Sequence, residues 1–480
     1  MVSDPQKLGM SQVFAELQKQ GDLIVIDKEV DPETEISGVI VAMEKLEGVP
    51  PLLFTKVRGY DFKVGANLFI DRNRLCRILH LPQDPIEFKE KVLQAIANPI
   101  APVMVPNGPC QEVVQTTGFD IFNLIPSIKA GLDDGGRYLQ PAIISKDPES
   151  GIRNMGMYRV MMKGKDDLIV NIRKEAHIGL QFDRAKKQGR PFPVAIVLSP
   201  HPDIYIASCT KLPIFKDELG LAGALRGKPV ELVKCKTVDL EVPADADLVI
   251  EGEVRPPYGE VVEGPWPEYL KYLSLPAKRP VMTVTAVTYR KEKFTYVCVA
   301  GTKENYALRI TNAPMFYGYL KNQFPDFVVD ATLTAGSAYW HHAVIKVNKS
   351  HYELEGMQYN LAMYAYAFST HVDTVILVDP DIDIYDINEV EWAIATRCNP
   401  KEQVHILPEG RGYRIPPIVG VRDLDEIPRL TKAKMVIDAT VPFHLKVKEI
   451  SGVKVFEKAR IRQVNLKDYL RSEDAKKYLR

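Results

Sequence analysis

Residues 259–269 read Gly-Glu-Val-Val-Glu-Gly-Pro-Trp-Pro-Glu-Tyr and place three carboxylates, two prolines and a tryptophan within eleven positions. This composition suits neither a helix nor a central strand, because Pro265 and Pro267 lack a backbone N–H and disfavour the helical conformation in the residue before them. We therefore expect a stiff loop in which Gly264 and Trp266 are extended. Loops of this kind often carry reactive side chains.

The same loop holds two carboxylates that could act on one substrate. Glu263 and Glu268 stand five residues apart, so on an extended segment both can reach a single basic residue or a single substrate. Their pKa values can then be driven apart, as in acid–base catalysis. The alternative interpretation is a solvated acidic surface loop, and the loop alone does not decide between the two.

Polar residues of the types that bind ions occur in three further stretches. Residues 154–159 read Asn-Met-Gly-Met-Tyr-Arg, and a strand here would place Asn154 and Arg159 on opposite faces. His177 lies in the stretch Lys-Glu-Ala-His-Ile-Gly, and Glu218 lies in Lys-Asp-Glu-Leu-Gly. Each residue alone is as compatible with a polar core or helix-cap position as with a binding site.

Taken in chain order, these stretches resemble the UbiD family of prenylated-flavin-dependent aromatic acid decarboxylases. The shared pattern is Asn-x-Gly-x-Tyr-Arg, then a His, then a Glu before Leu-Arg-Gly-Lys-Pro, then Glu-Gly-Pro-x-x-Glu, and it runs from about Phe119 to about Pro442. The resemblance implies a carboxy-lyase that removes, or reversibly adds, CO₂ at an sp² carbon of an aromatic, heteroaromatic or conjugated acid. Prenylated FMN would serve as the electron sink.

The resemblance also implies roles for individual residues. Arg159 would hold the substrate carboxylate between Glu263 and Glu268, and Glu268 would donate the proton that replaces CO₂. The ligands of Mn²⁺ or Mg²⁺, which would bridge to the flavin phosphate with K⁺ nearby, would be Asn154, His177 and Glu218. The remaining flavin contacts would come from Met157, Tyr158, Arg159, Ser208, Cys209 and Pro213.

One position departs from the family pattern. Many members carry a Lys, thought to meet the flavin phosphate, just before the strand expected at 374–378, and this chain has Asp373 there. A different cation would then have to take its place. The candidates are His371 and Lys211.

Arg309 stands where relatives that act on apolar acids carry a small or neutral residue. A buried Arg needs an anion, so it either pairs with a protein carboxylate, points to solvent, or meets a second acidic group on the substrate. The last case predicts an aromatic or furan dicarboxylic acid. Tyr269 and His341 are the further candidates for substrate contact.

Composition and charge exclude several classes of protein. The 480 residues, 46% of them hydrophobic, are enough for two or three domains with filled cores. Lys plus Arg and Asp plus Glu both number 62, so the balance indicates neither a nucleic-acid nor a membrane-surface partner. No apolar run is long enough to predict a membrane span. Six scattered cysteines favour a reduced cytoplasm and argue against a Cys-based zinc site.

The pattern of elements predicts a mixed α/β, multidomain fold. Alternating helix and strand signals indicate a small α+β domain at 1–110, and many short β-type runs at 111–305 indicate a barrel or sandwich. Helices alternate with strands again in an α/β domain at 306–455, before a helical tail at 456–480. The resemblance narrows the second domain to a split β-barrel that holds the flavin, as in flavin reductases.

Several elements are expected with particular bounds, among them helices at 85–97 and 357–368, a strand at 204–207, a hairpin of 281–289 with 293–300, a covering loop at 408–427 and a terminal helix at 465–479. The resemblance further implies a homo-oligomer, a dimer or a hexamer, built through the third domain. It also implies a flavin prenyltransferase as the supplier of the cofactor.

Two other functions remain open from the sequence. A flavin reductase or ordinary FMN oxidoreductase on the same scaffold would keep the phosphate-binding residues but would have no use for Glu263 and Glu268. A non-catalytic subunit of a multi-subunit carboxylase is the second, and the presence of Arg159, Glu263 and Glu268 argues against it.

Overall fold

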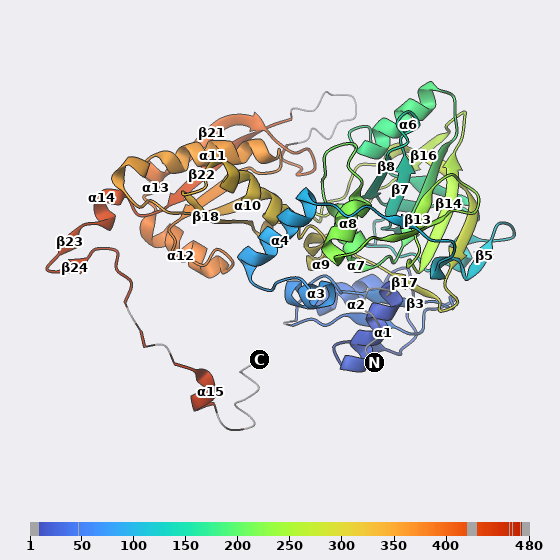
Figure 1. Cartoon of the computed structure of the whole chain (residues 1–480), viewed down its shortest axis with the longest axis horizontal. Coiled ribbons are helices and arrows are strands. Elements are labelled where there is room, and N and C mark those ends of the chain that lie inside the picture. Colours follow the sequence, from blue (N-terminus) through green and yellow to red (C-terminus); the bar gives the residue numbers. More distant parts are fainter. Residues whose placement is uncertain are drawn as a thin grey trace.

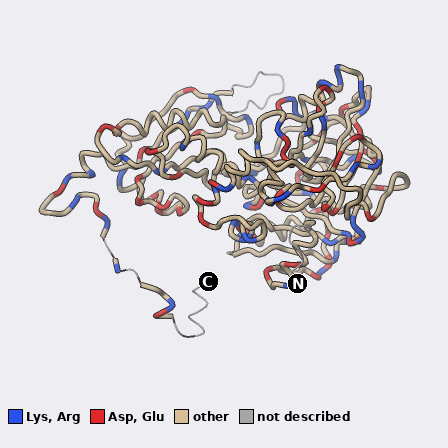
Figure 2. The backbone as a smooth tube through the Cα atoms, viewed as in Figure 1, with Lys and Arg blue, Asp and Glu red and all other residues tan. Residues whose placement is uncertain are grey.

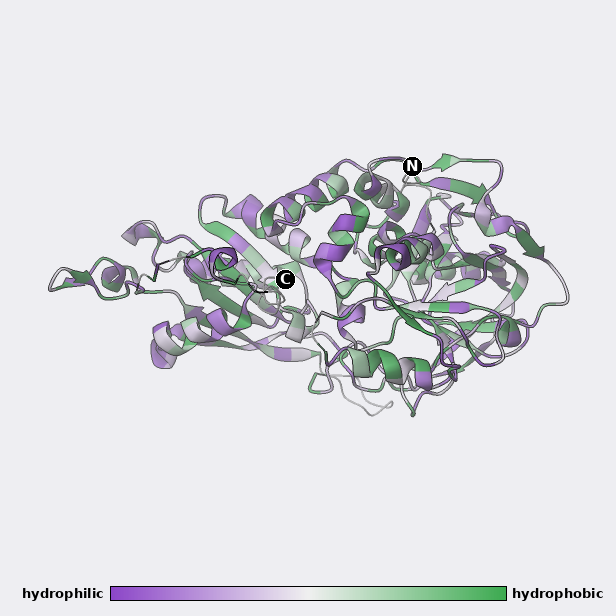
Figure 3. Ribbon diagram, turned by 90° about the horizontal axis from the view of Figure 1, so that it is seen from below, coloured by the Kyte–Doolittle hydropathy of each residue, from purple (hydrophilic) through white to green (hydrophobic). Residues whose placement is uncertain are grey.

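The computed structural model describes residues 9–46, 48–419, 430–459, 461–462, 464–470 and 472, which fold into three packed regions and a C-terminal arm (Figure 1). Lys and Arg are interspersed with Asp and Glu along the chain (Figure 2), in line with its balanced charge. Hydrophobic residues gather on the inner strands, and many outer helices carry hydrophilic faces (Figure 3). Within the described ranges, every helix is too short or too polar to cross a bilayer.

The N-terminal region is a small sheet covered by helices. Its helices are α1 (Met10–Gln20), α2 (Glu35–Met43), α3 (Arg72–Leu79) and α4 (Pro85–Ala97). Its strands, in spatial order, are β1 (Ile24–Ile26), β2 (Leu52–Phe54), β3 (Lys63–Ala66) and β17 (Phe294–Tyr296). Both α3 and α4 begin at an Asp whose carboxylate accepts backbone N–H groups of the first turn, a strong start signal.

The position of β17 corrects the hairpin expected at 281–289 and 293–300. Instead of pairing with the preceding strand, β17 runs parallel to β3 of the N-terminal region. Its Phe294 ring packs 5.3 Å from the ring of Phe14 in α1. Burial of aromatic side chains in this neighbouring core therefore decides the pairing, because a local turn signal cannot report it.

The central region is built on a large, mostly antiparallel sheet that forms a half-barrel, which confirms the expected split β-barrel. Its main path in spatial order is β6 (Tyr138–Leu139), β9 (Val160–Met162), β10 (Asp167–Val170), β16 (Ala277–Tyr289), β14 (Leu248–Val254), β11 (Phe192–Leu198), β7 (Ala142–Lys146) and β8 (Arg153–Met157). The long strand β16 also pairs with β5 (Val113–Gln115) and β15 (Glu260–Glu263). A small sheet beside it comprises β13 (Glu241–Pro243), β12 (Glu231–Lys234) and β4 (Val103–Met104).

Three helices of this region carry or border the candidate site: α6 (His177–Lys187), α7 (Pro202–Cys209) and α8 (Glu218–Arg226). The strand expected at 204–207 is wrong, because these residues lie inside α7. Every residue from Pro202 to Ser208 is buried, so the segment lacks the polar face that reveals a helix by its periodicity. The one sequence feature that indicates a helix here is the proline in its first turn.

The C-terminal region is an α/β unit with strand order β18 (Val328–Leu333), β19 (His342–Val347), β20 (Thr374–Val378), β22 (Thr431–Ala439) and β21 (Val404–Arg411). The middle strands β19, β20 and β22 are parallel. Helices α10 (Asn312–Gln323) and α11 (Met357–Phe368) pack in one core cluster, and α12 (Ile387–Arg397) packs in another. This arrangement agrees with the α/β pattern of the sequence.

Two buried polar contacts tie the regions together. In the connecting helix α9 (Lys303–Ala307), the carboxylate of Glu304 accepts the backbone N–H groups of Asn67 and Phe69 at 3.0 and 3.3 Å. Lys89 of α4 forms a buried ion pair with Asp330 of β18. Helix α4 also packs against both α10 and α8, so it bridges the central and C-terminal regions.

Beyond the C-terminal sheet, the chain leaves as an arm (Figure 1). It contains α14 (Phe443–Lys446), the short hairpin β23 (Glu449–Ile450) and β24 (Val453–Lys454), and α15 (Leu466–Tyr469). The helix expected at 465–479 is described only as α15, since residues 471 and 473–480 lie outside the described residues. The loop expected at 408–427 begins inside β21, which pairs with β22, and its residues 420–427 also lie outside them.

Candidate active site

Arg159 lies between Glu263 and Glu268 and binds both. Its Nε and Nη2 donate to the two oxygens of Glu263 at 2.7 and 2.9 Å, and its Nη1 donates to Oε1 of Glu268 at 2.6 Å. The guanidinium carbon also lies 4.8 Å from the ring of Trp266. The structure thus brings the three predicted catalytic residues into one contact network.

The loop that carries the two glutamates is anchored at both ends. Strand β15 pairs with β16 and ends at Glu263, so the first part of the stretch is a strand and not a loop. The sequence predicts an extended Gly264, and this prediction is wrong. The residue has φ +99°, a conformation that a residue without Cβ adopts readily. Further along, the backbone N–H of Trp266 donates to Ser274 Oγ at 3.2 Å.

Burial separates the two glutamates. The Glu263 side chain is 0% exposed and both its oxygens are held, whereas the Glu268 side chain is 19% exposed and one oxygen is held. Burial lowers the pKa of Arg159, but the hydrogen bond to Glu263 and the charges of both carboxylates outweigh it and raise the pKa above its ordinary value. Arg159 therefore stays a cation, and Glu268 is the carboxylate that a substrate can reach.

The predicted metal ligands lie on three elements that contact one another, since helices α6 and α8 both pack against strand β8. His177 is the first residue of α6, Glu218 is the first residue of α8, and Asn154 lies in β8. Glu218 Oε2 accepts the backbone N–H of Met155 at 2.8 Å, which places this carboxylate beside Asn154. Helix N-termini present free N–H groups and a partial positive charge, so the junction also suits an anion such as a phosphate.

The side chains at this junction fit a bound cation. Glu218 is 3% exposed and forms no ion pair with another described residue, and burial raises its pKa to about 8. Among the described residues, Asn154 Nδ2 is buried without a hydrogen-bond partner, and as a donor it suits the oxygen of a phosphate beside the cation. Burial and the charge of Lys211 lower the pKa of His177, which favours the neutral imidazole that binds metals. In the described part of the chain, no group of three or more His, Cys, Asp or Glu side chains is arranged to hold a metal ion by itself.

The remaining predicted flavin contacts lie along α7 and β8. Cys209 Sγ is 3.7 Å from Met157 Sδ, so the end of α7 touches the end of β8. Ser208 donates to the carbonyl of Tyr205 within the helix. Burial raises the pKa of Tyr158 to about 12, so this phenol stays protonated. Pro213 is exposed in the segment that leads to α8.

Arg309 and Tyr269 form a pair next to Glu268. The Arg309 guanidinium carbon lies 4.8 Å from the Tyr269 ring, and its Nη1 donates to the carbonyl of Asn305 at 2.6 Å. Across the described residues, Arg309 forms no ion pair with a carboxylate. The buried Tyr269 hydroxyl likewise lacks a hydrogen-bond partner within those residues.

His341 directly precedes β19, next to the position where the family Lys was expected. Its Nδ1 is 3.3 Å from Oδ2 of Asp373, and the same oxygen also accepts from Lys432 of β22. Burial and the charges of His341 and Lys211 lower the pKa of His371 to about 2. His371 is therefore neutral in this structure, and the cation that contacts Asp373 is Lys432. Lys211 stays a prediction for the flavin phosphate.

Three residues near the site were missed from the sequence. Tyr413, which follows β21, stacks on His371 at a ring distance of 3.6 Å. Partial burial lowers the pKa of Arg173, but the neighbouring Tyr413 and Glu268 raise it above its ordinary value. Lys432 reaches Asp373 only through the pairing of β22 with β20. Arg173 lies only four residues before His177, and this closeness in sequence could have identified it as a residue near the site.

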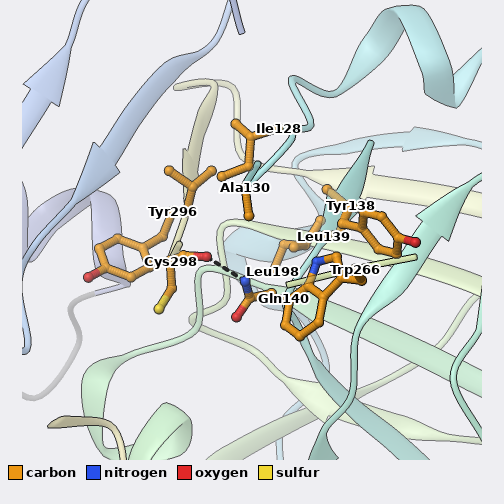
Figure 4. A pocket seen from close by; sticks show the side chains of 10 residues that line it. Ile128, Ala130, Tyr138, Leu139, Gln140, Leu198, Trp266, Tyr296 and Cys298 are labelled. Atoms are coloured by element: carbon orange, nitrogen blue, oxygen red, sulfur yellow. Dashed lines mark hydrogen bonds between the residues drawn. The ribbon is translucent and has the colours of Figure 1, made fainter. Parts of the chain in front are cut away.

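A small, largely apolar pocket is lined in part by Trp266 (Figure 4). Tyr138, Gln140 and Cys298 also line it, and Gln140 Nε2 donates to the carbonyl of Cys298 at 2.5 Å. Trp266 therefore contacts both this pocket and the guanidinium of Arg159.

Comparison with known proteins places the chain in a family. Residues 14–95, 103–303 and 305–439 match the N-terminal, Rift-related and C-terminal domains of 3-octaprenyl-4-hydroxybenzoate carboxy-lyase, UbiD. The chain is 29% identical over 449 residues to the phenolic acid decarboxylase of Bacillus subtilis, covering 90% of this chain and 92% of the relative.

Solved structures agree with this match. The UbiD-class enzyme HmfF from Pelotomaculum thermopropionicum, in complex with FMN, has a TM-score of 0.87 and 34% identity, covering 96% of this chain and 100% of that one. An evolved dimeric form of HmfF, in complex with prFMN, has a TM-score of 0.82 and 33% identity, with coverage of 96% and 100%. The chain belongs to the UbiD family of carboxy-lyases.

Proposed function

We propose that the chain decarboxylates, reversibly, an aromatic, heteroaromatic or conjugated acid with prenylated FMN as its cofactor. The observation that carries this proposal is Arg159 held between Glu263 and Glu268. A flavin reductase has no use for such a network. The complexes of HmfF with FMN and prFMN support the choice of cofactor.

Each residue of the network has a distinct task. The Arg159 guanidinium, fixed by the two oxygens of Glu263, presents its planar donors to the substrate carboxylate. When bound, prenylated FMN supplies the electron sink for the electrons that the departing CO₂ leaves behind. Glu268, which is partly exposed and held through one oxygen, delivers a proton to the carbon that lost CO₂.

Asn154, His177 and Glu218 would hold Mn²⁺, or Mg²⁺, against the flavin phosphate, with K⁺ nearby. The support is the burial of Glu218 at the start of α8, against strand β8. The buried Asn154 Nδ2, which lacks a partner within the described residues, is a donor that suits a phosphate oxygen. An amide, an imidazole and a carboxylate suit a hard or borderline ion that also keeps phosphate oxygen in its shell. Flavin contacts along Met157 and Cys209 would extend the same site.

For the substrate we favour a dicarboxylic acid, such as furandicarboxylate. Arg309 faces Tyr269 rather than a carboxylate in the described part of the chain, so its charge is available to a second acidic group. His341, whose buried Nε2 lacks a partner among the described residues, would add a polar contact. A charge-assisted hydrogen bond is worth about 1.5–3 kcal/mol, which corresponds to a preference of roughly one to two orders of magnitude over the monoacid.

The proposal is tested on protein from cells that also express a flavin prenyltransferase. The absorbance and mass of the bound cofactor identify it, and CO₂ release is then measured from furan-2,5-dicarboxylate, isophthalate, 2-furoate and benzoate. Bound FMN with reductase activity and no CO₂ release from any acid would refute the proposal. A diacid preference that survives Arg309→Leu would return Arg309 to a structural role while leaving the reaction class intact.

A further inference from the structure

One ion pair joins the two segments that carry Asn154 and Glu218. Arg153 is the first residue of β8 and Asp217 is the N-cap of α8, so each partner directly precedes one predicted metal ligand. Arg153 Nη2 and Nε lie 2.6 and 3.2 Å from Asp217 Oδ2. The contact links positions 64 residues apart in sequence and fixes the helix start against the strand.

Each partner is held by a second interaction. Asp217 Oδ1 accepts the backbone N–H of Leu219 at 3.0 Å and so caps α8. Arg153 Nη1 donates to Glu241 of β13 at 2.7 Å, and the other oxygen of Glu241 accepts from Lys146 of β7 at 2.6 Å. Because the side chains of Arg153 and Asp217 are 15% and 26% exposed, solvent screens the pair only in part.

The predicted ligands lie directly beside this pair. Glu218 Oε2 binds the backbone N–H of Met155, two residues after Arg153. The distance between the Asn154 and Glu218 side chains is therefore set by how β8 and the start of α8 are held together. Groups that orient metal ligands in this way typically change metal affinity by about 10- to 100-fold when they are removed.

We propose that Arg153, Asp217 and Glu241 form a positioning unit for the metal and flavin-phosphate site. The unit holds the start of α8 against β8 at the separation at which Asn154 and Glu218 share one cation. This inference rests on the metal site of the proposed function. Arg153 and Asp217 are positioning residues, since they act through the ligands that follow them.

The test measures binding rather than turnover. Asp217→Asn removes the charge but keeps an oxygen that can cap α8, and Arg153→Lys keeps the charge but not the two-pronged contact. Purified apo-protein is titrated with FMN and MnCl₂ and followed by flavin fluorescence, and bound manganese is measured after gel filtration. We expect about tenfold weaker binding for Asp217→Asn and a smaller loss for Arg153→Lys.

A matched control is available in the N-terminal region. Asp22→Asn removes the carboxylate of another long-range ion pair, in which Arg74 Nε lies 3.2 Å from Asp22 Oδ2, and it should bind FMN and Mn²⁺ as the wild type does. Thermal melts of all apo-proteins are recorded in parallel. If Asp217→Asn melts far below Asp22→Asn, its weaker binding could reflect lost stability, and the test then depends on Arg153→Lys. Unchanged affinity of Arg153→Lys for FMN and Mn²⁺ would overturn the proposal.

Glu218→Ala in the same titration separates this inference from the function on which it rests. Full binding of FMN and Mn²⁺ by Glu218→Ala would overturn the metal site itself. Loss of binding in Glu218→Ala, with wild-type affinity in Asp217→Asn and Arg153→Lys, would overturn only the positioning unit.

Discussion

Glu263 and Glu268 bind the same guanidinium but differ in burial, and this difference predicts two different responses to the same substitution. Glu263 is fully buried and both its oxygens accept from Arg159, at 2.7 and 2.9 Å. The Glu268 side chain is 19% exposed and accepts through one oxygen at 2.6 Å. We therefore expect Glu263 to hold the network together and Glu268 to reach the substrate.

Glu268→Gln should lose turnover but keep its fold. General acid catalysis typically contributes about two to four orders of magnitude in rate, and kcat should fall by that amount. The amide has nearly the same volume and keeps an oxygen for Arg159, so the melting temperature and the cofactor content should stay close to those of the wild type.

Glu263→Gln should lose both turnover and stability. The substitution removes one partner of a buried ion pair, and the Arg159 side chain, which is 8% exposed, keeps its charge. Leaving a buried charge without any partner typically destabilises a protein by about 3–5 kcal/mol, and here the cost should be smaller because Glu268 still pairs with Arg159. We therefore expect a melting temperature several degrees below that of Glu268→Gln.

Both variants are loaded with prenylated flavin and matched by cofactor absorbance before assay. CO₂ release and deuterium incorporation from solvent report the chemistry, and thermal melts report the stability. A Glu268→Gln enzyme within a few-fold of wild type would show that the proton comes from elsewhere. Equal melting temperatures of the two variants would contradict the view that the buried Glu263 stabilises the network and the partly exposed Glu268 does not.

Three further outcomes are expected. Glu218→Ala, purified from cells that express a flavin prenyltransferase, should lose Mn²⁺ and flavin together by metal analysis and absorbance; retention of both would remove Glu218 from the ligand set. The protein should be a homo-oligomer, a dimer or a hexamer, because the C-terminal arm exposes apolar side chains such as Ile450 and Val453; a light-scattering mass of 54.0 kDa would contradict this. Burial raises the pKa of Glu304 to about 8, so its contribution to stability is present below the ordinary pKa of a Glu and is lost as pH rises through about 8. Glu304→Gln should flatten the fall in melting temperature between about pH 5 and pH 9, and an unchanged pH profile would show that other groups cause it.

Elements with strong local signals were predictable from the sequence. The bounds expected for α4 and α11 are those observed, because Asp84 and Pro85 start α4 and the periodicity of apolar residues is local information. The family pattern around Arg159, Glu263 and Glu268 is also readable in chain order. Their roles stay predictions, but the structure brings all three into contact.

Only the tertiary structure decided which distant residues meet. The buried helix α7 has no polar face, so its sequence reads as a strand, and β17 pairs with β3 because the N-terminal core accepts its aromatic side chains. Lys432 reaches Asp373 only because β22 pairs with β20. The same holds for the full burial of Glu263 and the partial exposure of Glu268, since both follow from long-range packing that the spacing of residues along the chain does not contain.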